Sequence, residues 1–312
     1  MFSAKRISEF QPVIRSKVNK LCKKLEEYQR EDKVVPLGNA WMALTTDIIT
    51  EYAFAKSYDQ LDVDDFKETL HEALVAIYTT GHFALHFPIV FPILDRLPDS
   101  LVLRAQPALR SVMGLRKDLA VEVNKIRQGI NEGYKTVSHP TVFHELLESD
   151  LPESEKSDAR LGDEAQLIIA AGLITTAWAL TVGSYHISAN PAIANKLREE
   201  LRAAGLTASS EPDWHKLEAL PYLNGCVHEA MRLAHGVTTR SPRVAPDEEL
   251  IYKDWVIPKG TAVSMTNVHV LMNEEIFPEP KAFRPERWVG RPELERWFVP
   301  WTKGSRQCLG IK

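Results

Sequence analysis

Apolar and charged residues alternate along the first segment of the chain with the period of an α-helix. The apolar positions recur at steps of three and four, with lysine and arginine between them, and are Ile7, Phe10, Ile14, Val18, Leu21 and Leu25. This spacing puts the apolar side chains on one face, so the segment is predicted to form an amphipathic helix. The same reasoning, with proline and glycine as boundaries, predicts helices over Leu37–Phe54, Asp65–Tyr78, Leu103–Asn131, Pro191–Gly205 and Pro221–Gly236.

Between Leu250 and Met265 the pattern changes to that of β-strands. The stretch reads LIYKDWVIPKGTAVSM, and its apolar residues predict short strands. The segment Ile257–Gly260 within it fits a type I turn, with proline second and glycine fourth. No internal repeat is found. The chain is therefore expected to be mainly α-helical with a small β component.

One uncharged span has the length either to cross a membrane or to form a core helix. No lysine, arginine, aspartate or glutamate occurs between Glu164 and Lys196, and the apolar run is long enough for a bilayer. Threonine, serine, glycine and histidine dilute it, and acidic residues at its start with basic residues beyond its end suit the dipole of a soluble helix. We predict a helix buried on all sides, with a membrane span through Leu167–Ile187 as the alternative.

A second apolar stretch, from Gly81 to Leu103, contains several aromatic residues and is interrupted by Pro88, Pro92 and Pro98. These prolines prevent one long helix. Two interpretations stay open for it. The stretch is either a buried connector or an apolar loop that touches a membrane surface or guards the entrance for a lipophilic substrate.

Composition and charge narrow the class of protein. The chain has 312 residues, enough for about two domains, and is 44% hydrophobic and 26% charged, as in soluble globular proteins. A formal net charge of −4 without a basic stripe argues against a nucleic acid partner. The cysteines Cys22, Cys226 and Cys308 form no CxxC pair, so neither a disulfide framework nor a zinc knuckle is expected. The charged N-terminal segment is not expected to act as a secretory signal or membrane anchor.

Two motifs in the C-terminal half contain candidate ion pairs. Glu229 and Arg232 are three residues apart on the predicted helix after Pro221 and therefore share a face. Taken alone, such a pair is a surface ion pair of small energy. Arg287 belongs to FRPERW and, taken alone, is an ordinary loop arginine. If Arg287 reaches the pair, two guanidiniums share one carboxylate and lock distant segments together.

The last stretch, WTKGSRQCLGIK, places Cys308 between Gly304 and Gly310 and two residues after Arg306. The glycines have no Cβ, so the backbone can bend tightly and approach a flat object closely. Cys308 is either a buried small hydrophobe or a thiolate stabilised by backbone N–H groups or a metal. Arg306 could pair with a cofactor carboxylate.

Taken together, ExxR, PERW and WxxGxRxCxG, in that order near the C-terminus, resemble the cytochrome P-450 family of haem-thiolate monooxygenases. The resemblance extends over nearly the whole chain, and the opening FSAKRISEFQPVIRSKVNKLCKKL looks like that of fungal microsomal members. It implies part of the family fold, with central and C-terminal helices and little sheet. It also implies haem b, NADPH electrons delivered through a flavoprotein reductase, and a lipophilic small molecule of secondary metabolism as substrate.

Carried over residue by residue, the resemblance makes Cys308 the thiolate ligand of the haem iron, which favours cleavage of the O–O bond. Gly304, Gly310 and the signature aromatic Trp301 would shape the cofactor-binding loop around it. Arg306, together with Arg243 from SPRVAP, would hold the haem propionates. The resemblance also implies a structural triad behind the haem, formed by Glu229, Arg232 and Arg287.

The uncharged span matches the central helix of the family, whose signature is Ala/Gly-Gly-x-acid-Thr-Thr and which here reads AGLITT. Gly172 would leave room over the haem, and Thr175 and Thr176 would be the catalytic threonines, with Thr175 in proton delivery. Alternatively, the Thr175 hydroxyl bonds back to its own helix. Ile174 replaces the usual acid, so the relay would depend on water and Thr175. The same change modestly favours relatives that rearrange hydroperoxides without external electrons, as isomerases or dehydratases.

Further departures concern the signature aromatic and the ends of the chain. Trp301 stands where phenylalanine is commoner and keeps a flat apolar ring near the thiolate. Relative to the family, the membrane anchor and neighbouring sheet before Met1 and the helix after Cys308 are missing. We expect a single haem-thiolate monooxygenase domain over residues 1–312, truncated at both ends, or a non-catalytic remnant. The parent family lies on the cytosolic face of the endoplasmic reticulum membrane; this chain is expected to be cytosolic or peripheral, with contact through residues 81–103.

Overall fold

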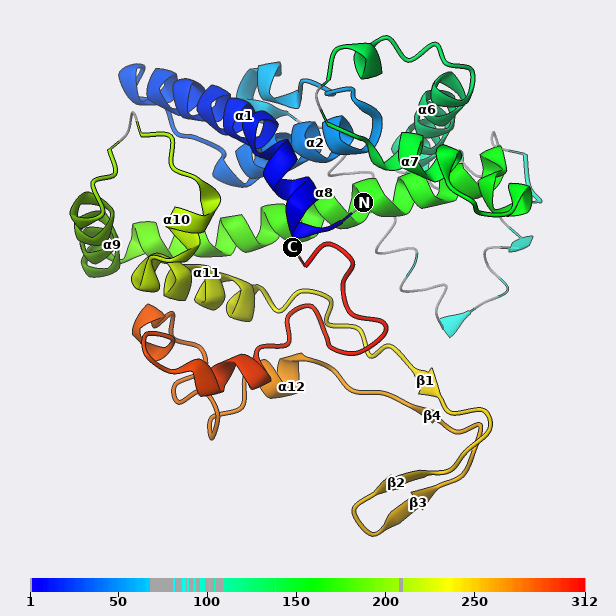
Figure 1. Ribbon diagram of the computed structural model, residues 1–312. Helices are drawn as coiled ribbons and strands as arrows, with labels where there is room; N and C mark the ends of the chain where they lie inside the picture. The colour runs from blue at the N-terminus through cyan, green and yellow to red at the C-terminus, as the bar shows by residue number, and fades with distance from the viewer. Residues whose placement is uncertain are drawn as a thin grey trace. The chain divides into compact units, whose positions relative to one another are not determined.

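The computed structural model describes residues 2–67, 109–137, 139–207 and 210–311, together with isolated residues between 81 and 104. The chain divides into two compact units, residues 1–178 (unit 1) and residues 179–311 (unit 2). Helix α8 (Asp158–Ala189) contributes to both (Figure 1).

Unit 1 is built from helices joined by short turns. Its other helices are α1 (Ala4–Arg30), α2 (Leu37–Phe54), α6 (Leu109–Arg127) and α7 (Val142–Glu148), and its 3-10 turns are η1 (Gln60–Asp62), η2 (Asp64–Phe66), η3 (Gly133–Lys135) and η4 (Glu153–Lys156). The predicted amphipathic first helix is confirmed, and Phe10 and Leu21 on its apolar face are each 2% exposed. The bounds predicted for the second helix agree with those of α2, which ends at Ala55 in the left-handed region (φ 55°).

Helix α8 is buried along one stripe and not on all sides, which corrects the prediction. The buried residues follow at steps of four and are Leu161, Ala165, Ile169, Leu173 and Ala177, each at most 2% exposed. They join the apolar core that α1, α2, α6 and α7 also form. On other faces of the helix, Leu167 is 62% exposed and Trp178 54% exposed. Hydrophobicity without charge predicted burial on every face, but a helix can keep apolar side chains exposed beside a fully buried stripe.

By length and composition α8 is also the one helix of the described residues that could cross a membrane. Its most apolar window has a mean hydropathy of 1.8, and 22% of that window is buried. The same test is passed by core helices of soluble proteins, and the buried stripe gives α8 a place in the core of unit 1.

Unit 2 begins with the end of α8 and continues through shorter helices. These are α9 (Pro191–Ala203), α10 (Trp214–Glu218), α11 (Pro221–Ala234) and α12 (Val268–Leu271), followed by the 3-10 segments η5 (Pro285–Arg287) and η6 (Pro292–Trp297). The Asn190 side chain caps α9 by accepting from the backbone N–H groups of Ala192 and Ile193. Helix α11 ends at His235, which has a positive φ of 63° and is followed by Gly236 at 60°. Both helices start at proline, as predicted.

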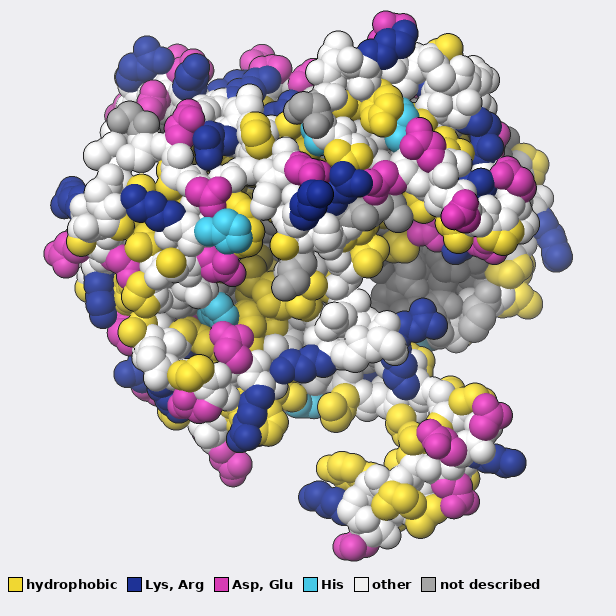
Figure 2. Space-filling view, in the orientation of Figure 1, with side chains coloured by type: hydrophobic (Ala, Val, Ile, Leu, Met, Phe, Trp, Pro, Cys, Tyr) yellow, Lys and Arg dark blue, Asp and Glu magenta, His cyan; other side chains and the backbone are white. Residues whose placement is uncertain are grey.

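The small β component consists of two antiparallel pairs along one extended hairpin (Figure 1). Strand β1 (Arg243–Val244) pairs with β4 (Ala262–Val263), and β2 (Leu250–Tyr252) pairs with β3 (Trp255–Ile257). Hydrophobic side chains are exposed over β2 and β3 (Figure 2), including Trp255 at 73% and Ile251 at 69%.

The turn before β4 lies one residue later than predicted. The N–H of Thr261 donates to the carbonyl oxygen of Pro258, so Gly260 occupies the third position of this turn, with a φ of 78°. A positive φ at the third position is typical of a type II turn, not of type I. Proline second and glycine fourth match the preferences of a type I turn starting at Ile257, which is why the sequence placed the turn one residue too early.

Two predicted segments fall mostly outside the described residues. Of the predicted helix Asp65–Tyr78, the described start belongs to η2 and has a φ of 53° at Asp65, so no α-helix begins there. The remainder lies outside the described residues, as does most of the apolar stretch Gly81–Leu103, including Phe83 and Phe91. Of its described members, Phe87 and Ile89 are 52% and 68% exposed.

Candidate functional site

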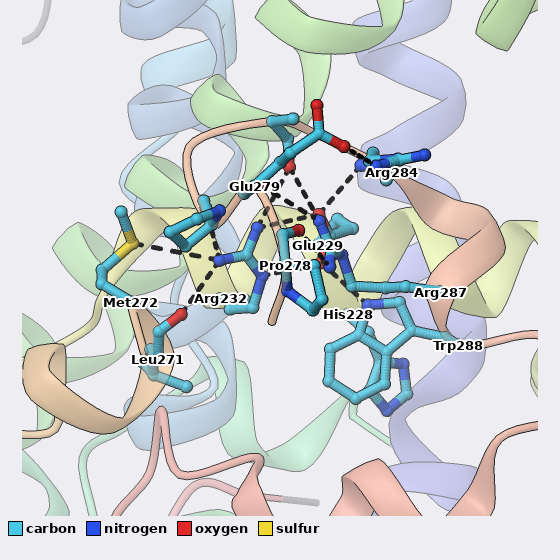
Figure 3. Close-up of polar contacts among 12 residues, drawn as sticks. His228, Glu229, Arg232, Leu271, Met272, Pro278, Glu279, Arg284, Arg287 and Trp288 are labelled. Carbon is cyan, nitrogen blue, oxygen red and sulfur yellow. Dashed lines mark hydrogen bonds and ion pairs between the residues drawn. The ribbon is translucent and has the colours of Figure 1, made fainter. Parts of the chain in front are cut away.

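The centre of unit 2 is a buried carboxylate, that of Glu229 on α11. It is fully buried, as is Arg232 one turn later on the same helix. The Arg232 guanidinium donates two parallel hydrogen bonds to the Glu229 carboxylate, from Nε to Oε1 at 2.7 Å and from Nη2 to Oε2 at 2.9 Å (Figure 3). The pair predicted from spacing is therefore formed, but inside the protein and not on its surface.

Three more groups reach the same carboxylate from the segment that follows α12. The backbone N–H of Arg284 donates to Oε2 at 2.9 Å, and the indole Nε1 of Trp288 donates to Oε1 at 2.9 Å. The Nε of Arg287 lies 3.3 Å from Oε1, an ion-pair contact of a side chain that is 7% exposed. The structure thus brings together Glu229, Arg232 and Arg287, as the sequence predicted, and adds Trp288. Trp288 is the last residue of the FRPERW motif, and its indole N–H is a hydrogen-bond donor for which the sequence analysis assigned no acceptor. This unassigned donor was the one sign in the sequence that Trp288 belongs to the network.

The remaining nitrogen atoms of the two guanidiniums bind backbone carbonyls. Arg232 Nη1 donates to Leu271 at 3.0 Å and to Pro280 at 2.7 Å, and Nη2 donates to Ala282 at 3.1 Å. Arg287 Nη1 donates to Pro278 at 3.0 Å. Burial lowers the pKa of Arg287, against the opposing effect of Glu229, but an arginine stays charged throughout the physiological range. The network therefore joins helix to loop, and Arg287 Nε, which makes no hydrogen bond, is held by its ion-pair contact with Glu229.

Close backbone contact on α11 depends on a glycine. A Cβ at Gly225 would lie 2.5 Å from the carbonyl oxygen of Pro285 on η5. That distance is shorter than any tolerated contact, so only glycine lets α11 approach η5 closely enough for the network to form.

A row of aromatic rings leads away from Trp288. The ring centroid of His228 lies 4.7 Å from that of Trp288 and 4.5 Å from that of Phe298, and Phe298 lies 5.3 Å from Trp301. In Figure 3 the rings of His228 and Trp288 lie next to each other beside the carboxylate network. These contacts connect the network to the start of the last loop.

The last loop, residues Trp301–Gly310, is called the cysteine loop here. The N–H of Cys308 donates to the carbonyl oxygen of Trp301 at 3.0 Å, which closes the loop, and the N–H of Gln307 donates to Gly304 at 3.1 Å. Gly304 has a φ of 90°, which favours glycine. The thiol of Cys308 is exposed, so the interpretation as a buried small hydrophobe is wrong for this cysteine.

Cys226 on α11 has the opposite environment. It is 2% exposed, and burial raises the pKa of its thiol to about 12. A thiol held in this way stays protonated and inert, which leaves Cys308 as the unit 2 cysteine with access to a ligand.

The cysteine loop contains the residue types that can hold a flat cofactor with a soft metal. No atom lies within 4 Å of where a Cβ at Gly304 would stand, and at Gly310 the nearest is Cys308 Sγ at 4.0 Å. A thiolate is a soft ligand of the kind that haem iron takes. Arg306 in the loop and Arg243 on β1 have exposed guanidiniums that can bind carboxylates, and Arg243 Nη1 also donates to the carbonyl of Pro242 at 3.0 Å. The residues present therefore fit a haem.

The central-helix residues belong to unit 1. The Thr175 hydroxyl donates to the carbonyl oxygen of Ala171 at 2.8 Å, which is the back-bonded arrangement left open by the sequence. Thr175 and Thr176 are both exposed. A Cβ at Gly172 would lie 2.8 Å from the Ile49 side chain, so this glycine lets α8 pack closely on α2. Ile174 is half-buried and packs against the core of unit 1.

Comparison with known proteins gives one consistent family. A sequence profile described as cytochrome P-450 matches residues 1–312. The chain is similar to the cytochrome P-450 monooxygenase sdnE of Sordaria araneosa, with 42% identity over 100% of this chain and 63% of the relative. It is similar to tpcC of Cochliobolus heterostrophus, with 39% identity over 99% of this chain and 60% of the relative. For claJ of Penicillium crustosum the identity is 34%, over 99% of this chain and 72% of the relative. The chain thus spans less than two thirds of the first two relatives.

Proposed function

Because the chain belongs to the cytochrome P-450 family, we propose that it acts as a haem-dependent monooxygenase on a lipophilic small molecule of fungal secondary metabolism. One oxygen atom of O2 enters the substrate and the other leaves as water, with two electrons and two protons taken up. The electrons come from NADPH through a flavoprotein reductase. Several relatives in fungi carry the same monooxygenase name, which supports the reaction class.

The observation that carries the proposal is the exposed Cys308 thiol on a loop closed by the Trp301 carbonyl. Cys308 binds the haem iron, and the bound haem supplies activation of O2. Gly304 and Gly310 let the haem plane approach the backbone, since neither has a Cβ. Trp301 holds the start of the loop through its contact with Phe298.

Two arginines and the buried network complete the proposed cofactor site. Arg306 and Arg243 bind the propionate carboxylates with charge-assisted hydrogen bonds. Glu229, Arg232 and Arg287 touch neither haem nor substrate, because their polar atoms bind one another and backbone carbonyls. Their task is to keep α11, η5 and the following loop in one arrangement.

Proton delivery falls to the central helix. The Thr175 hydroxyl uses its hydrogen on Ala171 and keeps lone pairs that can accept from a water molecule. Thr176 lies beside it, whereas Gly172, expected to leave room over the haem, packs α8 against Ile49 of α2. Ile174 offers no carboxylate, so the relay runs through water and hydroxyl.

The apolar Ile174 is also the observation that favours a second candidate function. A haem-thiolate isomerase or dehydratase that rearranges hydroperoxides needs no proton relay from a carboxylate and no external electrons. Turnover of fatty-acid hydroperoxides without NADPH would support it, and strict dependence on NADPH and reductase would exclude it.

The proposed cellular location of the enzyme is that of its family. The enzyme works at the cytosolic face of the endoplasmic reticulum membrane, where lipophilic substrates and the reductase are found. Residues 81–103 are the proposed membrane contact, and the exposed side chains of Phe87 and Ile89 are compatible with it.

The test is the difference spectrum of the reduced, carbon monoxide-bound protein after reconstitution with haem. A red-shifted Soret band typical of thiolate ligation is expected for the wild type and for Cys22→Ser, whose exposed thiol is the matched control. Cys308→Ala should lose the band. A wild type without the band, or a Cys308→Ala variant that keeps it, would overturn the proposal.

A further inference from the structure

The end of α11 meets the segment that leads into the cysteine loop through backbone atoms. Gly236 follows the helix with a φ of 60°, and a Cβ on it would lie 2.7 Å from the carbonyl oxygen of Pro300. A Cβ comes within 3.0 Å of a backbone oxygen only if one of the two shifts. Two separate features therefore favour glycine here, the left-handed backbone and the close approach of Pro300.

The end of α11 is itself held by α12. Asn267, the residue before α12, donates from Nδ2 to the carbonyl oxygen of His235 at 2.6 Å. Three residues earlier on α11, Arg232 Nη1 donates to the carbonyl oxygen of Leu271 at 3.0 Å. These two hydrogen bonds oppose a movement of α11, so a Cβ added at Gly236 would displace the opposite backbone and not the helix.

Pro300 is covalently continuous with the cysteine loop. It is buried, and its carbonyl group belongs to the planar peptide that joins it to Trp301. The next carbonyl along the chain, that of Trp301, accepts the N–H of Cys308 at 3.0 Å. A displacement of the Pro300 carbonyl therefore moves the acceptor on which the loop closes.

A second link between α11 and this segment runs through aromatic side chains. Trp288 donates to Glu229, and its ring centroid lies 5.1 Å from that of Phe298, which contacts Trp301. Aromatic rings can rotate about their side-chain bonds when a neighbour moves, whereas the backbone contact at Gly236 contains no rotatable side chain. The aromatic row thus holds the segment against α11, and the backbone contact sets the distance between them.

We propose that Gly236 is a positioning residue for the iron ligand, because its missing Cβ lets Pro300 rest on the end of α11 and so places the carbonyl that receives the Cys308 amide. Ordinary van der Waals contact of a Cβ begins at 3.4 Å, so a larger residue in place of Gly236 displaces the oxygen at 2.7 Å by about 0.7 Å. The consequence for iron ligation rests on the proposed function, whereas the effect on the loop does not.

Hydrogen–deuterium exchange read by mass spectrometry tests the proposal without haem. The peptide covering residues 302–311 contains the Cys308 amide, and a peptide from the end of α9 is the internal reference. In Gly236→Ala we expect exchange of the first peptide to become roughly fivefold faster, since its closing hydrogen bond is weakened, with no change in the second. Gly236→Asn should act alike, because asparagine tolerates a positive φ but still adds a Cβ.

Gly205 supplies the matched control for the backbone conformation. It follows α9 with a φ of 70°, and among the described residues no atom lies within 4 Å of where its Cβ would stand. Gly205→Ala therefore introduces the same strain at a positive φ without a contact. It should speed exchange at the end of α9 and leave the peptide of residues 302–311 unchanged.

Asn267→Ala acts on the same junction without adding an atom, which keeps the proposal testable if Gly236→Ala does not fold. Loss of the hydrogen bond to His235 frees the end of α11, so exchange of the peptide of residues 302–311 should become about twofold faster. The matched control is Asn131→Ala, since Asn131 Nδ2 donates to the carbonyl oxygen of Phe54 at the end of α2 at 2.7 Å. This control should leave that peptide unchanged.

The outcomes separate the positioning of the loop from the chemistry of the haem. Unchanged exchange of the loop peptide in Gly236→Ala or Asn267→Ala, or an equal acceleration in Gly205→Ala, would overturn the role of Gly236. After reconstitution with haem, Gly236→Ala should show a weaker thiolate Soret band than Gly205→Ala, and equal bands would refute the effect on the iron ligand. A wild type without the band would count against the proposed function, while the contrast in exchange would still support the positioning of the loop.

Discussion

Replacing Glu229 with glutamine should destabilise unit 2 severely, because the substitution keeps the size of the side chain and removes its charge. The carboxylate accepts from Arg232 Nε, Arg232 Nη2, the backbone of Arg284 and the indole of Trp288. In Glu229→Gln, one of the two oxygens becomes an NH2 group that faces donors. The hydrogen bonds to that oxygen are lost, each worth about 1.5–3 kcal/mol when charged groups take part.

The cost also includes the arginines that remain. Arg232 and Arg287 are 0% and 7% exposed at their side chains, so their charges stay buried without the carboxylate. Breaking a buried ion pair by removal of one partner costs about 3–5 kcal/mol. We therefore expect a loss of about 4 kcal/mol in the free energy of unfolding, which corresponds to a fall in Tm of roughly 10 °C.

The matched control is Glu293→Gln in the same unit. Arg291 Nε lies 2.8 Å from Glu293, nearly the distance found in the buried pair, but the two side chains are 49% and 58% exposed. Exposed pairs contribute less than about 1 kcal/mol, so Tm should fall by less than about 3 °C. Thermal unfolding followed by far-ultraviolet circular dichroism measures both variants. Equal shifts for Glu229→Gln and Glu293→Gln would refute the reasoning that burial decides the energy of the network.

Two further predictions concern protonation and access. Burial lowers the pKa of His144 to about 4, so between about 6.5 and about 4 the unfolded chain binds the extra proton and the folded chain does not. Stability should therefore fall by roughly 3 kcal/mol as the pH drops through this window, and His144→Gln should flatten the fall in thermal scans; an unchanged slope would contradict it. In a thiol-labelling experiment read by mass spectrometry, the exposed Cys22 and Cys308 should react in the native protein and the buried Cys226 only after unfolding. Equal rates for Cys226 and Cys22 would show that α11 is not packed as described.

The sequence predicted those parts of the site that depend on local spacing. Glu229 and Arg232 share a helix face whatever the rest of the chain does, and their pairing was confirmed. The contact of Arg287 with Glu229 could be proposed because its guanidinium can pair with the same carboxylate as Arg232 does. The indole of Trp288 could not be assigned, because the direction of a single N–H depends on how η5 packs on α11.

The errors came from features that only tertiary neighbours decide. The uncharged helix α8 was expected to be buried all round, yet its sequence does not specify which faces have neighbours, and Leu167 stays exposed. A threonine such as Thr175 can bond to its own helix or outward with the same residues around it, and the structure has the inward bond to Ala171. The burial of Cys226 has no local sign in the sequence, whereas the glycines and the arginine around Cys308 already marked it as a candidate ligand.

The buried network also affects the order in which parts of the chain can fold during translation. Arg232 binds carbonyl groups 39 to 50 residues further along, and Glu229 accepts from groups 55 and 59 residues later. Until translation has passed Trp288, the two charges on α11 stay in water and the helix has no completed partner. Contacts of such sequence separation form slowly, whereas N-terminal regions fold first. A nascent chain that stalls between Leu271 and Trp288 would therefore present a folded unit 1 followed by an unfolded segment, and cellular proteases would recognise that segment first.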